Sequence, residues 1–218
     1  MIIEKYLETG KNVKNEQLNY FIYLPDDYYH SKKKYPLILF LHGAGERGSN
    51  IDKIKRHGLP KRIEEGMNFP FVIVAPQCED GIWWSHDKKI VSLYVLMKKI
   101  VSELRIEDNR IYGTGLSMGG YGIIELASMH HKLFAAIIPI CGGTIRNKLN
   151  NLRDLPMWLF HGDKDDVIPF ESSLLIYDYL KKKNENIRIT IYKNIGHDSW
   201  TETYENQKIY NWLLSFKN

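Results

Sequence analysis

Residues 110–122, which read RIYGTGLSMGGYG, contain the pattern that decides the fold. A β-type run at 110–114 leads into the five residues GLSMG, and a helical segment begins at Gly119. A serine at the tip of a sharp strand-to-helix turn requires strained backbone angles, and the flanking Gly115 and Gly119 remove β-carbons that would clash there. We therefore predict that Ser117 is a nucleophile and that the amide of Met118 points to where an oxyanion would form. The alternative is a glycine-rich turn whose serine only caps the helix.

Short apolar runs alternate with helical patterns on both sides of this turn. Several runs, such as LILFL at 37–41 and FVIVA at 71–75, are continuously apolar, which is typical of strands buried on both faces of a parallel sheet. The predicted strands are 19–24, 37–41, 71–75, 110–114, 135–140, 157–160 and 188–192, and the predicted helices are 51–65, 88–104, 119–129, 171–182 and 203–216. This alternation predicts the α/β class, with a mostly parallel, doubly wound sheet, helices on both of its faces, and a single domain over residues 1–218.

The composition excludes several classes of protein. The 218 residues are 44% hydrophobic and 26% charged, close to a globular average, which argues against a disordered tail, a collagen-like fibre or a disulfide-stapled mini-protein. The formal net charge is only +4, and most basic residues are scattered, so we expect no nucleic-acid partner. No run of about 20 apolar residues is present, so we expect no membrane span. The N-terminal residues lack the apolar core of a signal peptide, which predicts a cytoplasmic location.

Candidates for a base follow the predicted strands. A serine hydroxyl is a poor nucleophile at its ordinary pKa, so Ser117 needs a base, and the base needs an orienting acid. His197 comes directly after the last predicted strand, at the carboxyl edge of the sheet, where open α/β sheets keep their sites. His42 and His161 also follow strands, but each precedes a glycine and is expected to brace its loop. We predict His197 as the base.

Three aspartates compete for the role of the acid. Asp163, Asp165 and Asp166 all lie in the loop after the predicted strand 157–160, between the serine and the histidine in chain order. The turn should aim one carboxylate at the imidazole and leave the others to cap or to face solvent. The residues themselves do not choose among the three.

A second glycine-rich turn follows an early strand. The run at 37–41 leads into HGAGERGSN, which could present a backbone amide to the same oxyanion as Met118. We predict Ala44 as that donor, with Gly45 as the second choice, and an ion pair between Glu46 and Arg47 that holds the loop. The alternative is an ordinary turn between a strand and a helix.

Four motifs together resemble a known superfamily. In order, LFLHGAGERG, GLSMGGYG, HGDKDDVIP and GHDSW resemble the α/β-hydrolases, and are most similar to their small esterase branch of dienelactone-hydrolase-like, feruloyl-esterase-like and polyhydroxybutyrate-depolymerase-like proteins, often labelled "predicted peptidase". The resemblance covers the chain from about residue 18 to its C-terminus. It implies Ser117 as nucleophile, His197 as base, Asp165 as acid and Ala44 as first oxyanion donor. We expect neither a cofactor nor a metal. The dienelactone hydrolases proper use cysteine, so the serine favours an esterase.

The superfamily's strand order also bears on the two cysteines. Cys78 and Cys141 follow strands that two others separate in that order, which puts them about 14 Å apart at about 4.8 Å per strand step. A disulfide needs α-carbons within about 7 Å. We therefore predict two free thiols, without a metal-ligand spacing.

The connecting segments indicate an open site. Only about 15 residues link the strand that ends near Cys141 to the one that begins near Met157, too few for a large helical lid. Trp83 and Trp84 lie in a loop at the same sheet edge as the triad, and Trp200 follows the base by three residues. Such aromatic faces suit sugar rings or a phenolic acyl group, although any one of them could instead pack beneath its loop.

The sequence thus predicts a serine carboxylic-ester hydrolase that works through an acyl-enzyme. The expected partner is a small-molecule or carbohydrate-linked ester, of a short-chain or phenolic acid such as an acetyl or feruloyl group. One alternative is a serine peptidase of the same fold, and a second is a non-catalytic binding module built on the same scaffold. The acyl and alcohol preferences and the oligomeric state stay open.

Overall fold

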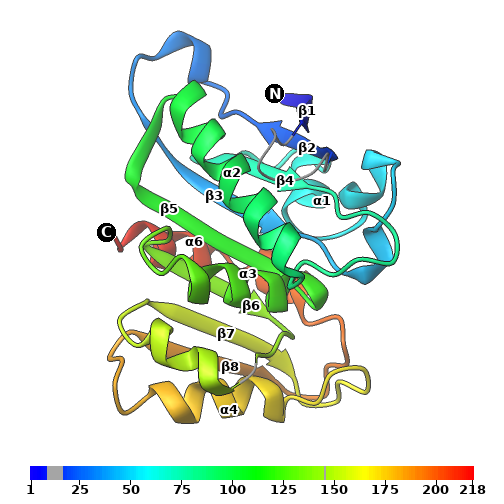
Figure 1. Cartoon of the computed structure of the whole chain (residues 1–218), viewed down its shortest axis with the longest axis vertical. Helices are drawn as coiled ribbons and strands as arrows, with labels where there is room; N and C mark the ends of the chain where they lie inside the picture. The colour runs from blue at the N-terminus through cyan, green and yellow to red at the C-terminus, as the bar shows by residue number, and fades with distance from the viewer. Residues whose placement is uncertain (9–16, 145) are drawn as a thin grey trace.

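A central sheet organises the computed structural model, which describes residues 1–8, 17–144 and 146–218 (Figure 1). The described residues form eight strands in the order β1-β2-β4-β3-β5-β6-β7-β8. The pairs β1/β2 and β2/β4 are antiparallel, and the remaining five neighbouring pairs are parallel. The strands are β1 (Ile2–Glu8), β2 (Gln17–Tyr23), β3 (Tyr35–Leu41), β4 (Val72–Pro76), β5 (Ile106–Leu116), β6 (Ala136–Ile140), β7 (Met157–Gly162) and β8 (Ile187–Tyr192).

Helices cover both faces of the sheet. In Figure 1, α2, α3 and α4 lie in front of the strands and α6 lies behind them. The α-helices are α1 (Gly58–Glu64), α2 (Asp87–Glu103), α3 (Met118–Met129), α4 (Glu171–Leu180), α5 (Trp200–Glu205) and α6 (Gln207–Leu214). Short 3₁₀ segments are η1 (Tyr28–His30), η2 (Ala44–Glu46), η3 (Ile51–Arg56) and η4 (Arg146–Leu152).

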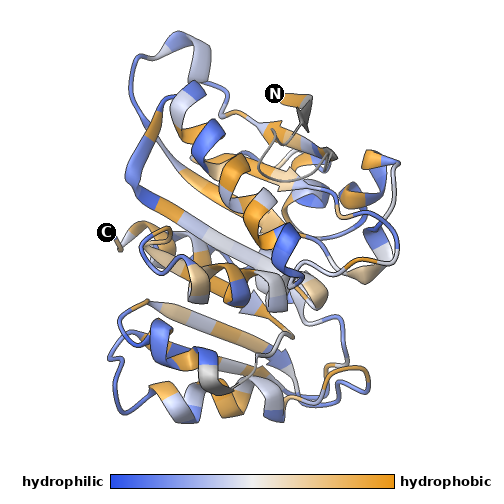
Figure 2. Ribbon diagram, in the orientation of Figure 1, coloured by the Kyte–Doolittle hydropathy of each residue, from blue (hydrophilic) through white to orange (hydrophobic). Residues whose placement is uncertain are grey.

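Two hydrophobic cores follow from the two-residue period of the strands. Leu37 and Leu39 of β3 pack on one face, in the core that α2, α3 and α4 complete, whereas Ile38 and Phe40 pack on the other face with α1, α5 and α6. All seven residues of β3 are buried, as the continuous apolar run predicts. In Figure 2, β5 is mostly blue and white, whereas orange appears on neighbouring strands and alternates with blue on the helices in front of the sheet. The predicted α/β class and mostly parallel, doubly wound sheet are confirmed.

The sequence reasoning missed one strand. β1 pairs antiparallel with β2, in a register that runs from Ile2↔Tyr23 to Glu8↔Gln17. It lies at the edge of the sheet, and its sequence IIEKYLE has no continuous apolar run, since an edge strand does not need one.

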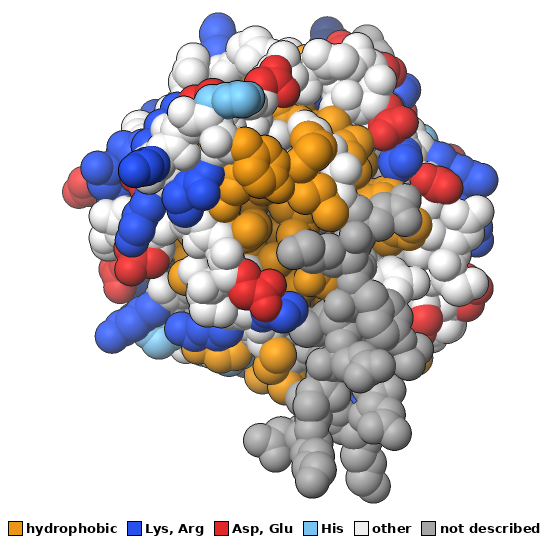
Figure 3. Space-filling view, turned by 90° about the horizontal axis from the view of Figure 1, so that it is seen from above, with side chains coloured by type: hydrophobic (Ala, Val, Ile, Leu, Met, Phe, Trp, Pro, Cys, Tyr) orange, Lys and Arg blue, Asp and Glu red, His pale blue; other side chains and the backbone are white. Residues whose placement is uncertain are grey.

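Seen from above, the molecule presents hydrophobic side chains bordered by charged ones on the end shown in Figure 3.

Two predicted helices are each broken in two. The predicted helix at 51–65 divides into η3 and α1, because Gly58 takes a left-handed φ of 65° and its missing side chain leaves room for the ring of Phe40. The predicted helix at 203–216 divides into α5 and α6 at Asn206, whose backbone is extended and whose side chain accepts a hydrogen bond from the amide of Lys208. An asparagine within an amphipathic pattern was the available signal for this second break.

The segment between β6 and β7 carries no large lid in its described part. It contains η4, whose Leu149 and Leu152 are fully buried in the core beside α3 and α4. Within the described ranges, every helix falls short of the length and apolar character that a membrane span needs.

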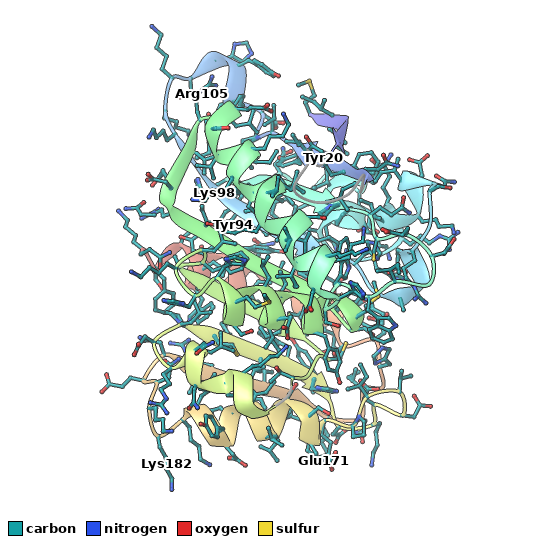
Figure 4. The ribbon with its side chains drawn as sticks, in the orientation of Figure 1. Tyr20, Tyr94, Lys98, Arg105, Glu171 and Lys182 are labelled. Carbon is teal, nitrogen blue, oxygen red and sulfur yellow. The ribbon has the colours of Figure 1, made fainter. Side chains whose placement is uncertain are left out.

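Side chains on the outer surface fit this layered arrangement (Figure 4). Tyr94 of α2 stacks on His130 at the end of α3, with ring centroids 3.9 Å apart, which ties these neighbouring helices together. Glu171 and Lys182, at or near the two ends of α4, are exposed on the outside of the molecule.

The two cysteines are free and follow β4 and β6, which β3 and β5 separate, so the predicted free thiols are confirmed.

Candidate active site

The turn between β5 and α3 has the strained geometry that its glycines predict. Ser117 has a left-handed φ of 52° with ψ of −117°, which is unusual for a residue with a β-carbon. A β-carbon on Gly115 would lie 2.5 Å from the carbonyl oxygen of Gly119, and one on Gly119 would lie 2.0 Å from that of Leu41. The amide of Ser117 donates to the carbonyl of Ile140, 2.9 Å away, and so fixes the turn to β6. The hydroxyl is thus held at the carboxyl end of β5.

Replacing Gly119 by alanine should destabilise the protein strongly. The new methyl group would overlap backbone atoms of β3, which cannot move aside as a flexible side chain can. We expect Gly119→Ala to lower the free energy of unfolding by at least about 3 kcal/mol in urea titrations. The matched control is Gly45→Ala, since a β-carbon there meets nothing within 4 Å. Equal unfolding midpoints for the two variants would contradict this reading of the turn.

The structure brings Ser117, His197 and Asp165 into one hydrogen-bonded chain. Ser117 Oγ lies 3.0 Å from His197 Nε2, and His197 Nδ1 lies 2.7 Å from Asp165 Oδ2. The serine stands after β5, the aspartate after β7 and the histidine after β8, at the carboxyl ends of three parallel strands. An ionised carboxylate only accepts hydrogen bonds, so Nδ1–H donates to Asp165, and Nε2 is left to accept the serine proton.

Asp165 is the aspartate that faces the imidazole. Its side chain is fully buried, and its second oxygen, Oδ1, accepts hydrogen bonds from the amides of Val167 and Ile168 at 2.9 and 2.8 Å. Burial raises the pKa of the Asp165 carboxyl, but the hydrogen bonds from His197 and from the two amides outweigh burial, and the pKa is lowered overall. The carboxylate is therefore ionised at neutral pH.

The other two aspartates have different surroundings. Asp163 Oδ1 accepts from the amide of Asn194 at 2.6 Å and so joins the loop after β7 to the loop after β8. Asp166 is exposed to solvent. The turn thus aims one carboxylate of the three at the base, in agreement with the position that the family resemblance implied.

A second histidine contacts the acid. His161, at the end of β7, is fully buried, and its Nε2 lies 2.8 Å from the carbonyl oxygen of Ile168 and 3.1 Å from Asp165 Oδ2. Its Nδ1 lies 2.7 Å from Ser173 Oγ. Burial lowers the pKa of His161, which keeps the ring neutral, with one N–H to share between the two oxygens. The predicted role of a loop brace is confirmed, but the sequence reasoning missed the contact with Asp165, for which the four-residue spacing was the available signal.

The predicted oxyanion donors begin two helices. Ala44 is the first residue of η2 and Met118 the first residue of α3, positions whose amides have no acceptor within their own helix. The loop that carries Ala44 is held by its neighbours: the amide of Gly43 donates to Glu46 Oε2 at 2.9 Å, and Arg47 Nε donates to the carbonyl of Ala44 at 2.9 Å. Among the described residues, the predicted ion pair between Glu46 and Arg47 is not found. Each of the two side chains instead contacts the backbone of the loop.

His42 braces this loop from below. It is fully buried, its Nε2 accepts from the amide of Cys78 at 2.9 Å, and its Nδ1 donates to the carbonyl of Gly43 at 2.6 Å. These two contacts fix a neutral tautomer, and burial lowers the pKa of His42 to about 4. The carbonyl of His42 accepts from Trp84 Nε1 at 3.1 Å. The predicted bracing role of His42 is confirmed.

Stability should fall between pH 7 and pH 5 because of His42. Its pKa is about 4 when folded and about 6.5 when unfolded, so below pH 6.5 the unfolded chain binds a proton that the folded chain does not. The contribution is present above pH 6.5 and is lost as the pH falls toward 4, by about 2 kcal/mol at pH 5. Between the two pH values, the free energy of unfolding should fall less in His42→Asn than in the wild type, and the difference should equal this amount. Urea titrations at the two pH values measure it. Equal losses of unfolding free energy in the two proteins would contradict the prediction. His161 is present in both proteins, so its own contribution cancels in the comparison.

The three predicted substrate-binding tryptophans have different surroundings. Trp84 is fully buried beneath the loop, against His42 and Gly122, so its predicted place in a substrate wall is wrong. Trp83 is 48% exposed on the same loop. Trp200 is mostly buried and packs edge-on against His197, with ring centroids 5.2 Å apart.

A histidine that the sequence analysis did not single out also belongs to this neighbourhood. His57 packs edge-on against Trp200, with centroids 5.5 Å apart, and its Nε2 lies 3.8 Å from Glu46 Oε1. It thereby connects the loop that holds Ala44 to the side of the site that holds His197. No motif in the sequence marked this residue.

A family model described as phospholipase/carboxylesterase matches residues 76–213, well over half of the chain. The chain belongs to the phospholipase/carboxylesterase family. Ser117, Asp165 and His197 all lie within the matched residues, whereas Ala44 lies before them. This family member has the α/β-hydrolase fold and falls in the class of carboxylesterase-type serine hydrolases.

Individual proteins agree with the family assignment. The "Probable feruloyl esterase C" of Aspergillus niger is 26% identical over 190 residues, which are 84% of this chain and 68% of that protein. The bifunctional acetylxylan esterase/xylanase XynS20E of Neocallimastix patriciarum is 30% identical over 142 residues, 62% of this chain and 20% of that protein. A solved thermostable esterase is 31% identical, with a TM-score of 0.87, over 100% of this chain and 63% of that one. The phospholipase/carboxylesterase chain thus spans about two thirds or less of these relatives' lengths.

Proposed function

We propose that the chain hydrolyses esters of short-chain or phenolic acids, including acetyl or feruloyl groups carried on carbohydrate, through an acyl-enzyme on Ser117. The observation that carries this proposal is the hydrogen-bonded chain from Ser117 Oγ through His197 to the buried Asp165, on a strained turn between β5 and α3. Nucleophilic catalysis of acyl transfer requires a serine hydroxyl that is hydrogen-bonded to a histidine, with a carboxylate that orients this histidine.

The reaction follows from the positions of these groups. Ser117 Oγ attacks the ester carbonyl while its proton passes to His197 Nε2, and Asp165 stabilises the imidazolium that forms. The amides of Met118 and Ala44 donate to the oxyanion of the tetrahedral intermediate. Nε2–H then protonates the departing alkoxide, which leaves the acyl group on Ser117. Water, activated by His197, attacks that acyl group and releases the carboxylic acid.

The substrate class rests on the surroundings of the triad and on the relatives. Trp83 presents nearly half of its side chain to solvent, and Trp200 packs beside the base, so aromatic surface is available for a phenolic acyl group or a sugar ring. Two of the relatives carry names that refer to feruloyl and acetylxylan esters. The described part of the segment between β6 and β7 is packed into the core, which favours access by esters attached to bulky carbohydrate.

The peptidase alternative is tested by a matched pair of substrates. p-Nitrophenyl acetate and p-nitroacetanilide share an acyl group and differ in whether an oxygen or a nitrogen leaves. We expect hydrolysis of the ester and no measurable hydrolysis of the anilide, and we expect p-nitrophenyl butyrate and methyl ferulate to exceed p-nitrophenyl octanoate in kcat/KM. Equal turnover of ester and anilide would favour a peptidase. A chain inert toward all four esters would favour a binding module.

The expected partner is an ester substrate, and we expect neither a nucleic acid nor a membrane as a partner. The cytoplasmic location stays a prediction from the composition and the sequence pattern. Fractionation of the native host with an antibody to the chain would test the location.

A further inference from the structure

Cys141, which the proposed reaction does not use, lies directly beside the triad. It follows β6 and is fully buried. Its Sγ, a ring nitrogen of His197 and a carboxylate oxygen of Asp165 all lie within 4.8 Å of one another. Among the residues that the structure describes, these form the one group of three such side chains with their ligand atoms so close together. The nucleophile and these three residues follow β5, β6, β7 and β8, which are parallel, so their carboxyl ends point to the same side of the molecule (Figure 1).

The backbone at Cys141 turns its thiol toward the triad. Its φ is 39°, in the left-handed region that residues with a β-carbon rarely adopt, and its amide donates to the carbonyl of Phe160 at 2.8 Å. Burial raises the pKa of the Cys141 thiol, and the amide of Ser117 and the hydroxyl of Ser199 are among its neighbours. Cys141 and Ser117 are thus two residues with left-handed backbone angles at the ends of the neighbouring strands β6 and β5.

The three groups form a ligand set for a soft divalent cation. Thiolate, imidazole and carboxylate are the side chains that bind Zn²⁺, with Zn–S near 2.3 Å and Zn–N near 2.0 Å. A sulfur and a nitrogen on one such ion are therefore about 3.5 Å apart in tetrahedral geometry. In this structure His197 Nδ1 lies 2.7 Å from Asp165 Oδ2, closer than two ligands of one tetrahedral ion, and the sulfur lies within 4.8 Å of a ligand atom of each. An ion bound here therefore takes the place of the hydrogen bond between His197 and Asp165.

We propose that Cys141, His197 and Asp165 bind a thiophilic divalent cation, such as Zn²⁺ or Cd²⁺, and that this ion inhibits the enzyme. This inference rests on the proposed function of the same site. The thiol gives its proton to solvent and binds as thiolate, and the neutral imidazole binds through one nitrogen. Coordination at Nε2 occupies the lone pair that accepts the serine proton, whereas coordination at Nδ1 leaves the ring proton on Nε2. In both cases His197 can no longer take a proton from Ser117.

Access to the site sets the time course of inhibition. The side chains of Cys141 and Asp165 are fully buried, whereas that of His197 is 20% exposed. The ion therefore enters past the imidazole, after a local movement of the His197 loop. Inhibition should develop progressively after mixing and should be reversed by a chelator.

The test compares the two buried cysteines. Wild type, Cys141→Ser and the matched control Cys78→Ser are titrated with CdCl₂ and ZnCl₂, with two readouts: the ultraviolet thiolate-to-Cd²⁺ charge-transfer band, and ester hydrolysis relative to each protein's own metal-free rate. We expect the band and the inhibition in wild type and in Cys78→Ser. In Cys141→Ser we expect no band and a half-inhibitory concentration at least about tenfold higher.

Each outcome decides the proposal. Inhibition of Cys141→Ser at wild-type concentrations, or a band that depends on Cys78 instead, would overturn it. Cys141→Gly, whose backbone tolerates the left-handed conformation, is the second variant if the serine variant does not fold. Failure of the proposed function can be told apart from failure of this inference. If the wild type hydrolyses no ester in the absence of metal, the Cd²⁺ band still tests whether Cys141 binds the ion.

Discussion

Ser117→Ala should abolish ester hydrolysis, with kcat for p-nitrophenyl acetate falling on the order of 10⁶-fold. Alanine has no oxygen to attack the carbonyl, so no acyl-enzyme forms, and only the oxyanion donors and substrate binding remain. The overall fold should be retained, because the structural hydrogen bond of this residue is made by its backbone amide to Ile140. Initial rates with both proteins at equal concentration measure the effect.

The control for this variant is a serine far from the site. Ser102→Ala removes an exposed hydroxyl near the end of α2, where it donates to the carbonyl of Lys99. Its kcat should stay within about twofold of wild type, as expected for a surface substitution. Equal activity of Ser117→Ala and Ser102→Ala would overturn the assignment of the nucleophile.

Asp165→Asn should lower kcat by about 10⁴-fold, the second largest effect that we expect. The amide keeps the size of the carboxylate, but its NH₂ group can face His197 Nδ1 as a donor. The imidazole then carries its proton on Nε2, the wrong tautomer to accept one from Ser117. Steady-state kinetics on p-nitrophenyl acetate should show the loss in kcat, with little change in KM.

The two neighbouring aspartates supply matched controls. Asp166→Asn alters an exposed side chain and should leave kcat within about twofold of wild type. Asp163→Asn weakens the contact to the amide of Asn194, so we expect a loss of stability larger than its loss of activity. A loss of activity in Asp166→Asn as large as that in Asp165→Asn would mean that the orienting acid is assigned wrongly.

Much of the fold could be predicted because buried parallel strands leave a strong pattern. The continuous apolar runs at β3 and β4 report burial on both faces, and they located these strands to within a few residues. β1 left no such pattern because it lies at the sheet edge. The breaks at Gly58 and Asn206 depend on a contact with Phe40 and on a local cap, which helical periodicity does not report.

The candidate site was predictable where chain order and strand ends carried the information. Ser117 and His197 follow from that order, whereas the choice of Asp165 over its neighbours depends on the direction in which a turn aims each side chain. Tryptophan exposure could not be predicted either: Trp83 and Trp84 are adjacent in sequence, yet one is 48% exposed and the other is fully buried. The contacts of His57 and Cys141 with the site arise from tertiary packing alone.

Covalent trapping of the nucleophile tests the central claim most directly. Diethyl p-nitrophenyl phosphate reacts with a serine that a neighbouring base activates, releases p-nitrophenol and leaves a stable phosphoryl adduct. Intact-mass and peptide mass spectrometry of the treated wild type should show a single diethylphosphoryl group on the peptide that contains Ser117, and none on Ser117→Ala. An unmodified wild type, or an adduct that forms equally on Ser117→Ala, would contradict the claim that Ser117, His197 and Asp165 form a working nucleophilic triad.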